Sequence, residues 1–227
     1  MDPDRSNALE LHKRLLEEYG QPVWRVKLPP LDELVSTILS QNTNDNYRDR
    51  AFDALVRRFP DWAAVRDADP EAVISAIRPA GLANQKGPRI QSVLQQITHE
   101  QEHLSLAYVQ DMPPAEALQE LLKFKGVGPK TAAIVLLFSL DMPAFPVDTH
   151  IHRVTGRLGL RPEGMNAEKA HVFLADVFPP DTYYAVHLNL IRHGREICHA
   201  RSPECERCFL KKLCKDYLSR SSPQAQA

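Results

Sequence analysis

The stretch KFKGVGPKTAAIV, residues 123–135, lies between two segments whose apolar residues recur at helical spacing. Gly126 and Gly128 allow positive φ and close approach of a partner, and Pro129 suits the first turn of a helix. A Walker A loop is excluded because Pro129 precedes the lysine, and a dinucleotide-binding loop would follow a strand. The stretch predicts two helices joined by a glycine turn. The N–H groups that begin the second helix would bind a DNA phosphate, with an ordinary corner between helices as the alternative.

Helix signals recur along the rest of the chain. Asp69, Pro70 and Glu71 combine an N-cap, a proline at the first helical position and an acid in the first turn. Alternation of apolar and polar residues, which is typical of half-buried strands, is nearly absent. The longest apolar run, residues 132–140, is far shorter than the roughly 20 residues of a membrane span. We therefore predict an all-α protein without a membrane helix.

Charge is distributed unevenly along the sequence. The net charge is −1, but residues 1–120 carry 13 basic and 19 acidic side chains, whereas residues 121–227 carry 15 and 10. This asymmetry indicates a surface that faces a polyanion, with a mixed solvated surface as the alternative. The charged start MDPDRSN lacks the apolar region of a secretory signal, so we expect a cytoplasmic, nucleoid-associated protein.

Two residues are candidates for chemistry. Lys130 lies in the first turn of its helix, where the positive end of the helix dipole favours the neutral amine that a Schiff-base nucleophile needs. A solvated phosphate contact is the alternative role. Asp148 precedes another helix and is a natural N-cap, but paired with Lys130 it would complete a base and nucleophile set.

The cysteines form a compact metal-binding pattern. Cys198, Cys205, Cys208 and Cys214 follow the spacing C-x6-C-x2-C-x5-C. Clustered thiols in a cytosolic chain favour a metal over disulfides. The uneven spacing favours a [4Fe–4S] cluster, with zinc as the alternative.

These motifs together resemble one family. GVGPKTA at 126–132, VDTHIHRV at 147–154 and the cysteine spacing are similar to the endonuclease III branch of the helix-hairpin-helix DNA glycosylases. The resemblance implies that Lys130 attacks the sugar C1′ of a damaged nucleotide, forms an imine and cuts the strand by β-elimination. It also implies that Asp148 assists and that the four cysteines hold a [4Fe–4S] cluster.

The resemblance also implies DNA contacts. Gln41 in LSQNTND would fill the gap left by a nucleotide turned out of the duplex, and Leu82 in AGLANQK would act as a wedge against the opposite strand. A polar helix cap and a small satellite core are the respective alternatives. The hairpin residues and a basic residue of the cysteine loop would bind the backbone: Gly126, Val127, Gly128 and Arg201.

The implied architecture has two helical lobes with a DNA cleft between them. A six-helix, barrel-like lobe would span residues 30–142 and contain the helix-hairpin-helix at about 113–140. Residues 1–29 and 143–227 would form the iron–sulfur cluster lobe. We expect a monomer that binds double-stranded DNA containing damaged bases or abasic sites.

The implied function is base excision repair. Lys130 favours a bifunctional DNA N-glycosylase and abasic-site lyase that removes oxidised pyrimidines of the thymine glycol type. Thr37 stands where adenine-removing relatives carry a catalytic glutamate. Two alternatives stay open: a mismatch-directed or monofunctional glycosylase, and a non-catalytic DNA-binding module with a structural metal.

Overall fold

The structure is a computed structural model that describes residues 3–101 and 103–221. Over these residues the regular structure consists of α-helices and short 3-10 helices, without a β-strand, which confirms the predicted all-α class. No helix in these ranges is both long and apolar enough to cross a membrane.

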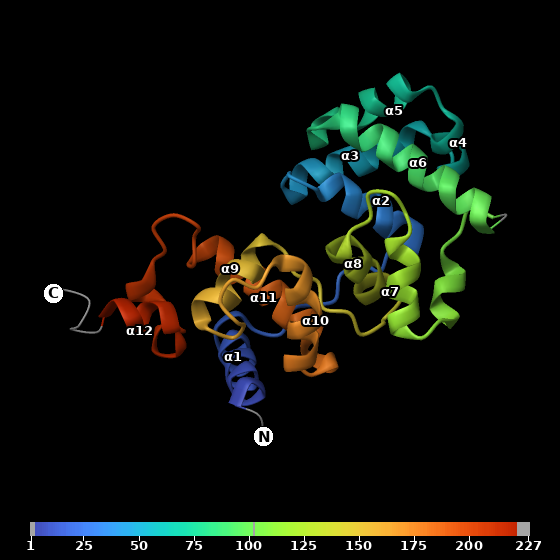
Figure 1. Cartoon of the computed structure of the whole chain (residues 1–227). Helices are drawn as coiled ribbons and strands as arrows, with labels where there is room; N and C mark the ends of the chain where they lie inside the picture. Colours follow the sequence, from blue (N-terminus) through green and yellow to red (C-terminus); the bar gives the residue numbers. More distant parts are fainter. Residues whose placement is uncertain (1–2, 102, 222–227) are drawn as a thin grey trace. The chain divides into compact units, whose positions relative to one another are not determined.

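The chain divides into two compact units, Val26–Met142 and Met1–Arg25 with Pro143–Ala227. Residues 26–29, which the expected division gave to the cluster lobe, group with the first of these units. The helices of each unit can be followed by colour in Figure 1.

The unit Val26–Met142 is built around one buried helix. Its helices are α2 (Pro30–Ser40), α3 (Asp45–Arg58), α4 (Trp62–Asp67), α5 (Pro70–Ile77), α6 (Ala83–Gln101), α7 (Pro114–Leu122) and α8 (Pro129–Ser139), with 3-10 turns η1 (Arg78–Ala80) and η2 (Ala107–Asp111). Nearly every residue of α8 after Lys130 is buried. Helix α8 packs against α2 and α7, beside which it lies in Figure 1.

The short helix α4 was not predicted and adds to the six expected helices. Asp61 caps it by accepting a hydrogen bond from the Ala64 N–H at 2.7 Å, and Val65 is buried. The predicted cap at Asp69 is confirmed, because its side chain accepts from the Glu71 N–H at 3.3 Å and Pro70 occupies the first helical position.

The second unit is assembled from both ends of the chain. It contains α1 (Pro3–Tyr19), α9 (Thr149–Leu158), α10 (Ala167–Val177), α11 (Tyr183–Glu196) and α12 (Lys215–Ser221), with 3-10 turns η3 (Pro180–Thr182), η4 (Cys205–Arg207) and η5 (Lys211–Leu213). Helix α11 packs against both α1 and α9. Helix α9 is therefore supported by α11, most of whose residues are buried.

A buried cation joins two segments of the unit Val26–Met142. Lys86 on α6 is only 2% exposed, and its Nζ donates to the carbonyl oxygens of Leu39 and Ala80, each at 2.8 Å. Burial lowers the pKa of Lys86. The two carbonyls lie near the C-terminal end of α2 and at the end of η1, so one ammonium fixes the start of both following loops.

We predict that Lys86→Met destabilises the protein by about 2–4 kcal/mol, because methionine keeps the apolar stem but leaves two carbonyls without a donor. Urea unfolding followed by circular dichroism measures the change. Lys125→Met, at an exposed lysine of the same unit, is the matched control and should change the free energy of unfolding little. Equal stability of the two variants would contradict the bridging role of Lys86.

Candidate functional site

The hairpin between α7 and α8 has a positive φ at one of its two glycines, whereas Gly128 is extended with φ of −95°. Gly126 has φ of +92°, a conformation that disfavours other residues. Gly128 is the N-cap of α8 without a side-chain capping bond, and a Cβ at this position would meet no atom within 4 Å. The turn therefore presents an open backbone surface at the head of α8.

Val127 differs from its glycine neighbours. Its side chain is 5% exposed, and its N–H donates to the Phe124 carbonyl oxygen at 3.0 Å. The residue consequently anchors the turn in the core, and neither its side chain nor its N–H is free to bind phosphate.

Lys130 lies half-buried in the first turn of α8. No hydrogen bond or ion pair to another described residue engages its ammonium group. The next residues, Thr131 and Ala132, are buried. The amine is therefore attached to a rigid helix end and is not committed to a structural contact.

Asp148 is the N-cap of α9, as predicted. Its Oδ1 accepts from the Ile151 N–H at 2.8 Å, and Oδ2 has no partner among the described residues. The segment before it is anchored, because Nδ1 of the buried His187 donates to the Pro146 carbonyl oxygen at 2.9 Å. The cap thus leaves one carboxylate oxygen available. Asp148 and Lys130 belong to different units of the chain.

Leu82 combines exposure with backbone strain. It is 47% exposed and has φ of +48°, a conformation that is costly for a leucine. Its carbonyl oxygen accepts from the N–H groups of Gln85 and Lys86, each at 2.9 Å. The start of α6 therefore holds the leucine in this exposed position.

Gln41 follows α2 and is held by a residue that sequence reasoning missed. Its Oε1 accepts from Nη1 of Arg89 on α6 at 2.7 Å. Arg89 also lies against the hairpin, because a Cβ on Gly126 would be 2.6 Å from Arg89 Cδ. Only the helical spacing of Lys86 and Arg89, three residues apart, hints at this arrangement in the sequence.

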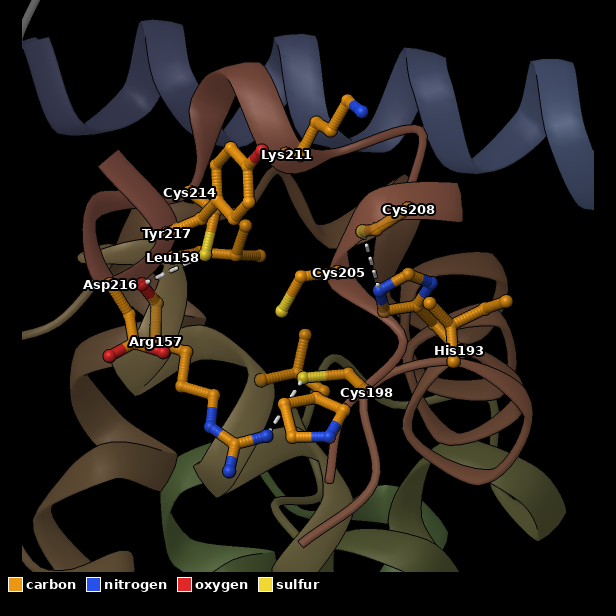
Figure 2. Close-up of a pocket in the computed structure, with 13 residues that line it drawn as sticks. Arg157, Leu158, His193, Cys198, Cys205, Cys208, Lys211, Cys214, Asp216 and Tyr217 are labelled. Atoms are coloured by element: carbon orange, nitrogen blue, oxygen red, sulfur yellow. Dashed lines mark hydrogen bonds between the residues drawn. The ribbon is translucent and has the colours of Figure 1, made fainter. Parts of the chain in front are cut away.

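The four cysteines surround one cavity. Cys198, Cys205, Cys208 and Cys214 line about 390 Å³ of space that atoms do not fill, part of it open to solvent. Figure 2 shows their sulfur atoms turned toward this common space. In the described residues no three His, Cys, Asp or Glu side chains stand close enough to hold a single metal ion. Thiols arranged around a cavity suit a polynuclear cluster, whose irons each take a ligand from outside.

Basic side chains from α9 hold the loop of the first cysteine. Arg157 Nη1 lies 3.3 Å from Cys198 Sγ and donates to the His199 carbonyl oxygen at 2.7 Å. Arg153 Nε donates to the Cys198 carbonyl oxygen at 3.0 Å. A guanidinium can donate hydrogen bonds to the sulfur ligands of an anionic metal centre. The residues therefore fit an anionic iron–sulfur centre.

The buried side of the cavity is lined by a neutral histidine. Burial lowers the pKa of His193 to about 4. Its Nε2 lies 3.6 Å from Cys208 Sγ, and a dashed line in Figure 2 marks this interaction. Its Nδ1 lies 3.1 Å from the Tyr19 hydroxyl. Burial also raises the pKa of the Cys208 thiol to about 11, so metal binding there must displace a bound proton. Arg201, which is predicted to contact DNA, is exposed in the loop between Cys198 and Cys205.

Comparison with known proteins identifies the family. Residues 35–180 match the HhH-GPD superfamily of base excision DNA repair proteins, and residues 198–214 match the iron–sulfur binding domain of endonuclease III. A putative DNA glycosylase of Arabidopsis thaliana is 38% identical over 168 residues, which span 74% of this chain but only 57% of that protein. Endonuclease III of Thermotoga maritima is 33% identical over 197 residues, spanning 87% of this chain and 88% of that protein.

A solved structure agrees with these matches. The trapped endonuclease III–DNA covalent intermediate has a TM-score of 0.82 and 25% identity, covering 96% of this chain and 99% of that chain. The predicted family, the class of DNA glycosylase and abasic-site lyase, and the iron–sulfur cofactor are confirmed. The alternatives of zinc and of a non-catalytic module are thereby set aside. Because the superfamily match covers well over half of the sequence, we conclude that this chain belongs to the HhH-GPD superfamily of base excision DNA repair proteins and carries the iron–sulfur binding domain of endonuclease III.

Proposed function

We propose that this protein is a bifunctional DNA N-glycosylase and abasic-site lyase that removes oxidised pyrimidines of the thymine glycol type. The observation that carries the proposal is the uncommitted amine of Lys130, half-buried at the head of α8 directly after the glycine hairpin. A monofunctional glycosylase would have no need of a lysine at this position. The residues that we assign to the reaction lie in one chain, so we propose that the protein acts as a monomer. Its proposed substrate, duplex DNA, would place the protein at the nucleoid.

The proposed reaction begins with attack by the amine of Lys130. Nζ forms a bond to C1′ of the sugar as the glycosidic bond breaks, and the base leaves with the electron pair and gains a proton. Loss of a proton from nitrogen and opening of the sugar ring give an imine between Nζ and C1′. Removal of a proton from C2′ then expels the 3′ phosphate, which cuts the strand. The amine is regenerated when water hydrolyses the imine.

We propose that the carboxylate of Asp148 assists Lys130 in this reaction. Its Oδ2 is free while Oδ1 caps α9, so the carboxylate can stabilise positive charge at C1′ or accept a proton without unwinding the helix. The anchored segment before Asp148 limits the motion of this residue. Less conformational entropy is then lost when the carboxylate is positioned beside the sugar.

We propose that the duplex is bound by the hairpin and by two protruding residues. The uncapped N-terminus of α8 would take a phosphate at the N–H groups of Lys130 and Thr131. Leu82, exposed and strained, would wedge between bases, and Gln41 would occupy the gap left by the target nucleotide. Gly126 and Gly128 permit close approach of the backbone, while Val127 would act only by anchoring the turn.

We propose that Cys198, Cys205, Cys208 and Cys214 each bind one iron of the [4Fe–4S] cluster. When bound, the cluster supplies a rigid cross-link among the loop segments between Cys198 and Cys214. Arg153 and Arg157 attach the same loop to α9, the helix that Asp148 caps. Arg201, exposed in this loop, would then meet a DNA phosphate.

We predict that Lys130→Gln abolishes the covalent adduct that borohydride forms between the protein and an abasic duplex, because an amide cannot form an imine. Strand cleavage should fall by three orders of magnitude or more, as expected for loss of a nucleophile. Lys125→Gln, at an exposed lysine of the same hairpin, is the control and should trap normally. Unchanged visible absorbance in both variants verifies that the cluster is present. Trapping by Lys130→Gln would refute the assignment, and absence of trapping by the natural chain would favour a monofunctional glycosylase.

A second prediction separates the charge of Asp148 from its capping role. Asparagine caps helices as well as aspartate, so Asp148→Asn should change the free energy of unfolding by less than about 0.5 kcal/mol. The cleavage rate should nevertheless fall by about 10²–10⁴-fold, the range expected for loss of an acid or base. Single-turnover kinetics on a thymine glycol duplex provide the measurement. A rate close to that of the natural chain would leave Asp148 with a purely structural function.

A further inference from the structure

Arg89 connects two features of the unit Val26–Met142 that the proposed function uses separately, Gln41 and the hairpin at Gly126. It lies on α6, three residues after the buried Lys86, and is half-buried. Its guanidinium contacts Gln41 and its stem contacts Gly126 of the hairpin. We propose that Arg89 is a positioning residue that fixes which end of the Gln41 amide faces DNA.

The chemistry of the two groups determines the orientation of the amide. A guanidinium only donates hydrogen bonds, so the Gln41 atom that lies 2.7 Å from Nη1 must be the carbonyl oxygen. The NH₂ group of Gln41 is then left for other partners. Gln41 would therefore meet DNA as a hydrogen-bond donor and would contact acceptor atoms of the bases, such as guanine O6 or pyrimidine O2.

The stem of Arg89 is fixed by the hairpin. A Cβ on Gly126 would lie 2.6 Å from Cδ, 2.8 Å from Nε and 2.9 Å from Cγ of Arg89. Arg89 thus occupies the space that any side chain at position 126 would need. The φ of +92° at Gly126 is a second reason for glycine at this position. With its stem against the turn and its head on Gln41, Arg89 has few alternative rotamers to lose on binding DNA.

The backbone next to Gln41 is held by the same helix. Lys86 Nζ donates to the Leu39 carbonyl oxygen at 2.8 Å, two residues before Gln41. One stretch of α6 therefore fixes both the main chain and the side chain of the gap-filling segment. This arrangement would orient Gln41 before the duplex arrives, which lowers the cost of binding an extruded nucleotide.

This inference rests on the proposed function, and a double-mutant cycle tests it. Equilibrium binding is measured to a duplex that contains tetrahydrofuran, an abasic analogue that the lyase chemistry cannot cleave. The variants are Arg89→Ala, Gln41→Ala and the double variant, and Arg50→Ala, an exposed arginine on α3 of the same unit, controls for loss of charge. We expect Arg89→Ala to weaken this binding about 10-fold, with little further loss in the Gln41→Ala background, because the arginine acts through the glutamine.

A direct phosphate contact by Arg89 predicts different results. Its loss would then weaken the Gln41→Ala variant as much as the natural chain, and would weaken binding to undamaged duplex uniformly with a lower salt dependence. Those outcomes would overturn the positioning role. Gln41→Glu, which pairs with Arg89 but offers no donor, should bind the analogue at least as poorly as Gln41→Ala, and retention of full affinity would also overturn it. Failure of borohydride trapping would instead count against the proposed function, because this binding cycle does not depend on an imine.

Discussion

The buried ammonium of Lys86 is the interaction on which the loops that carry Gln41 and Leu82 depend. Two carbonyl oxygens, from Leu39 and Ala80, converge on it at 2.8 Å. Both segments end in exposed loops, one with Gln41 and the other with Leu82. A charge without access to water must keep its hydrogen bonds, since losing them would cost several kilocalories per mole. The two loops are therefore fixed by the same cation, and the strain at Leu82 can be maintained.

Helix α9 provides the corresponding link in the other unit. Its first turn is capped by Asp148, while Arg153 and Arg157 farther along bind the main chain around Cys198. The cysteine loops contain little secondary structure beyond two 3-10 turns. A metal centre that cross-links these loops would thus also support the helix that carries the carboxylate. Such a coupling would relate binding of the cluster to the position of Asp148.

The sequence allowed the helical class, the hairpin, the Asp69 and Asp148 caps and the cysteine centre to be predicted, because each is a local signal of spacing or capping. Helix α4 was missed because six residues show too little periodicity. Val127 was assigned to DNA together with its glycine neighbours, yet tertiary packing buries it. Lys86 and Arg89 could not be recognised, because a surface lysine and a buried bridging lysine look alike until the fold brings Leu39, Ala80 and Gln41 beside α6.

The proposed reaction depends most on the identity of the covalent nucleophile. After borohydride reduction of the complex with an abasic duplex, nuclease and protease digestion followed by tandem mass spectrometry locates the residue that bears the sugar remnant. We expect the remnant on Nζ of Lys130 alone. A remnant on Lys125, on Lys123 or on the N-terminal amine would contradict the central claim, since each would place the chemistry outside the head of α8.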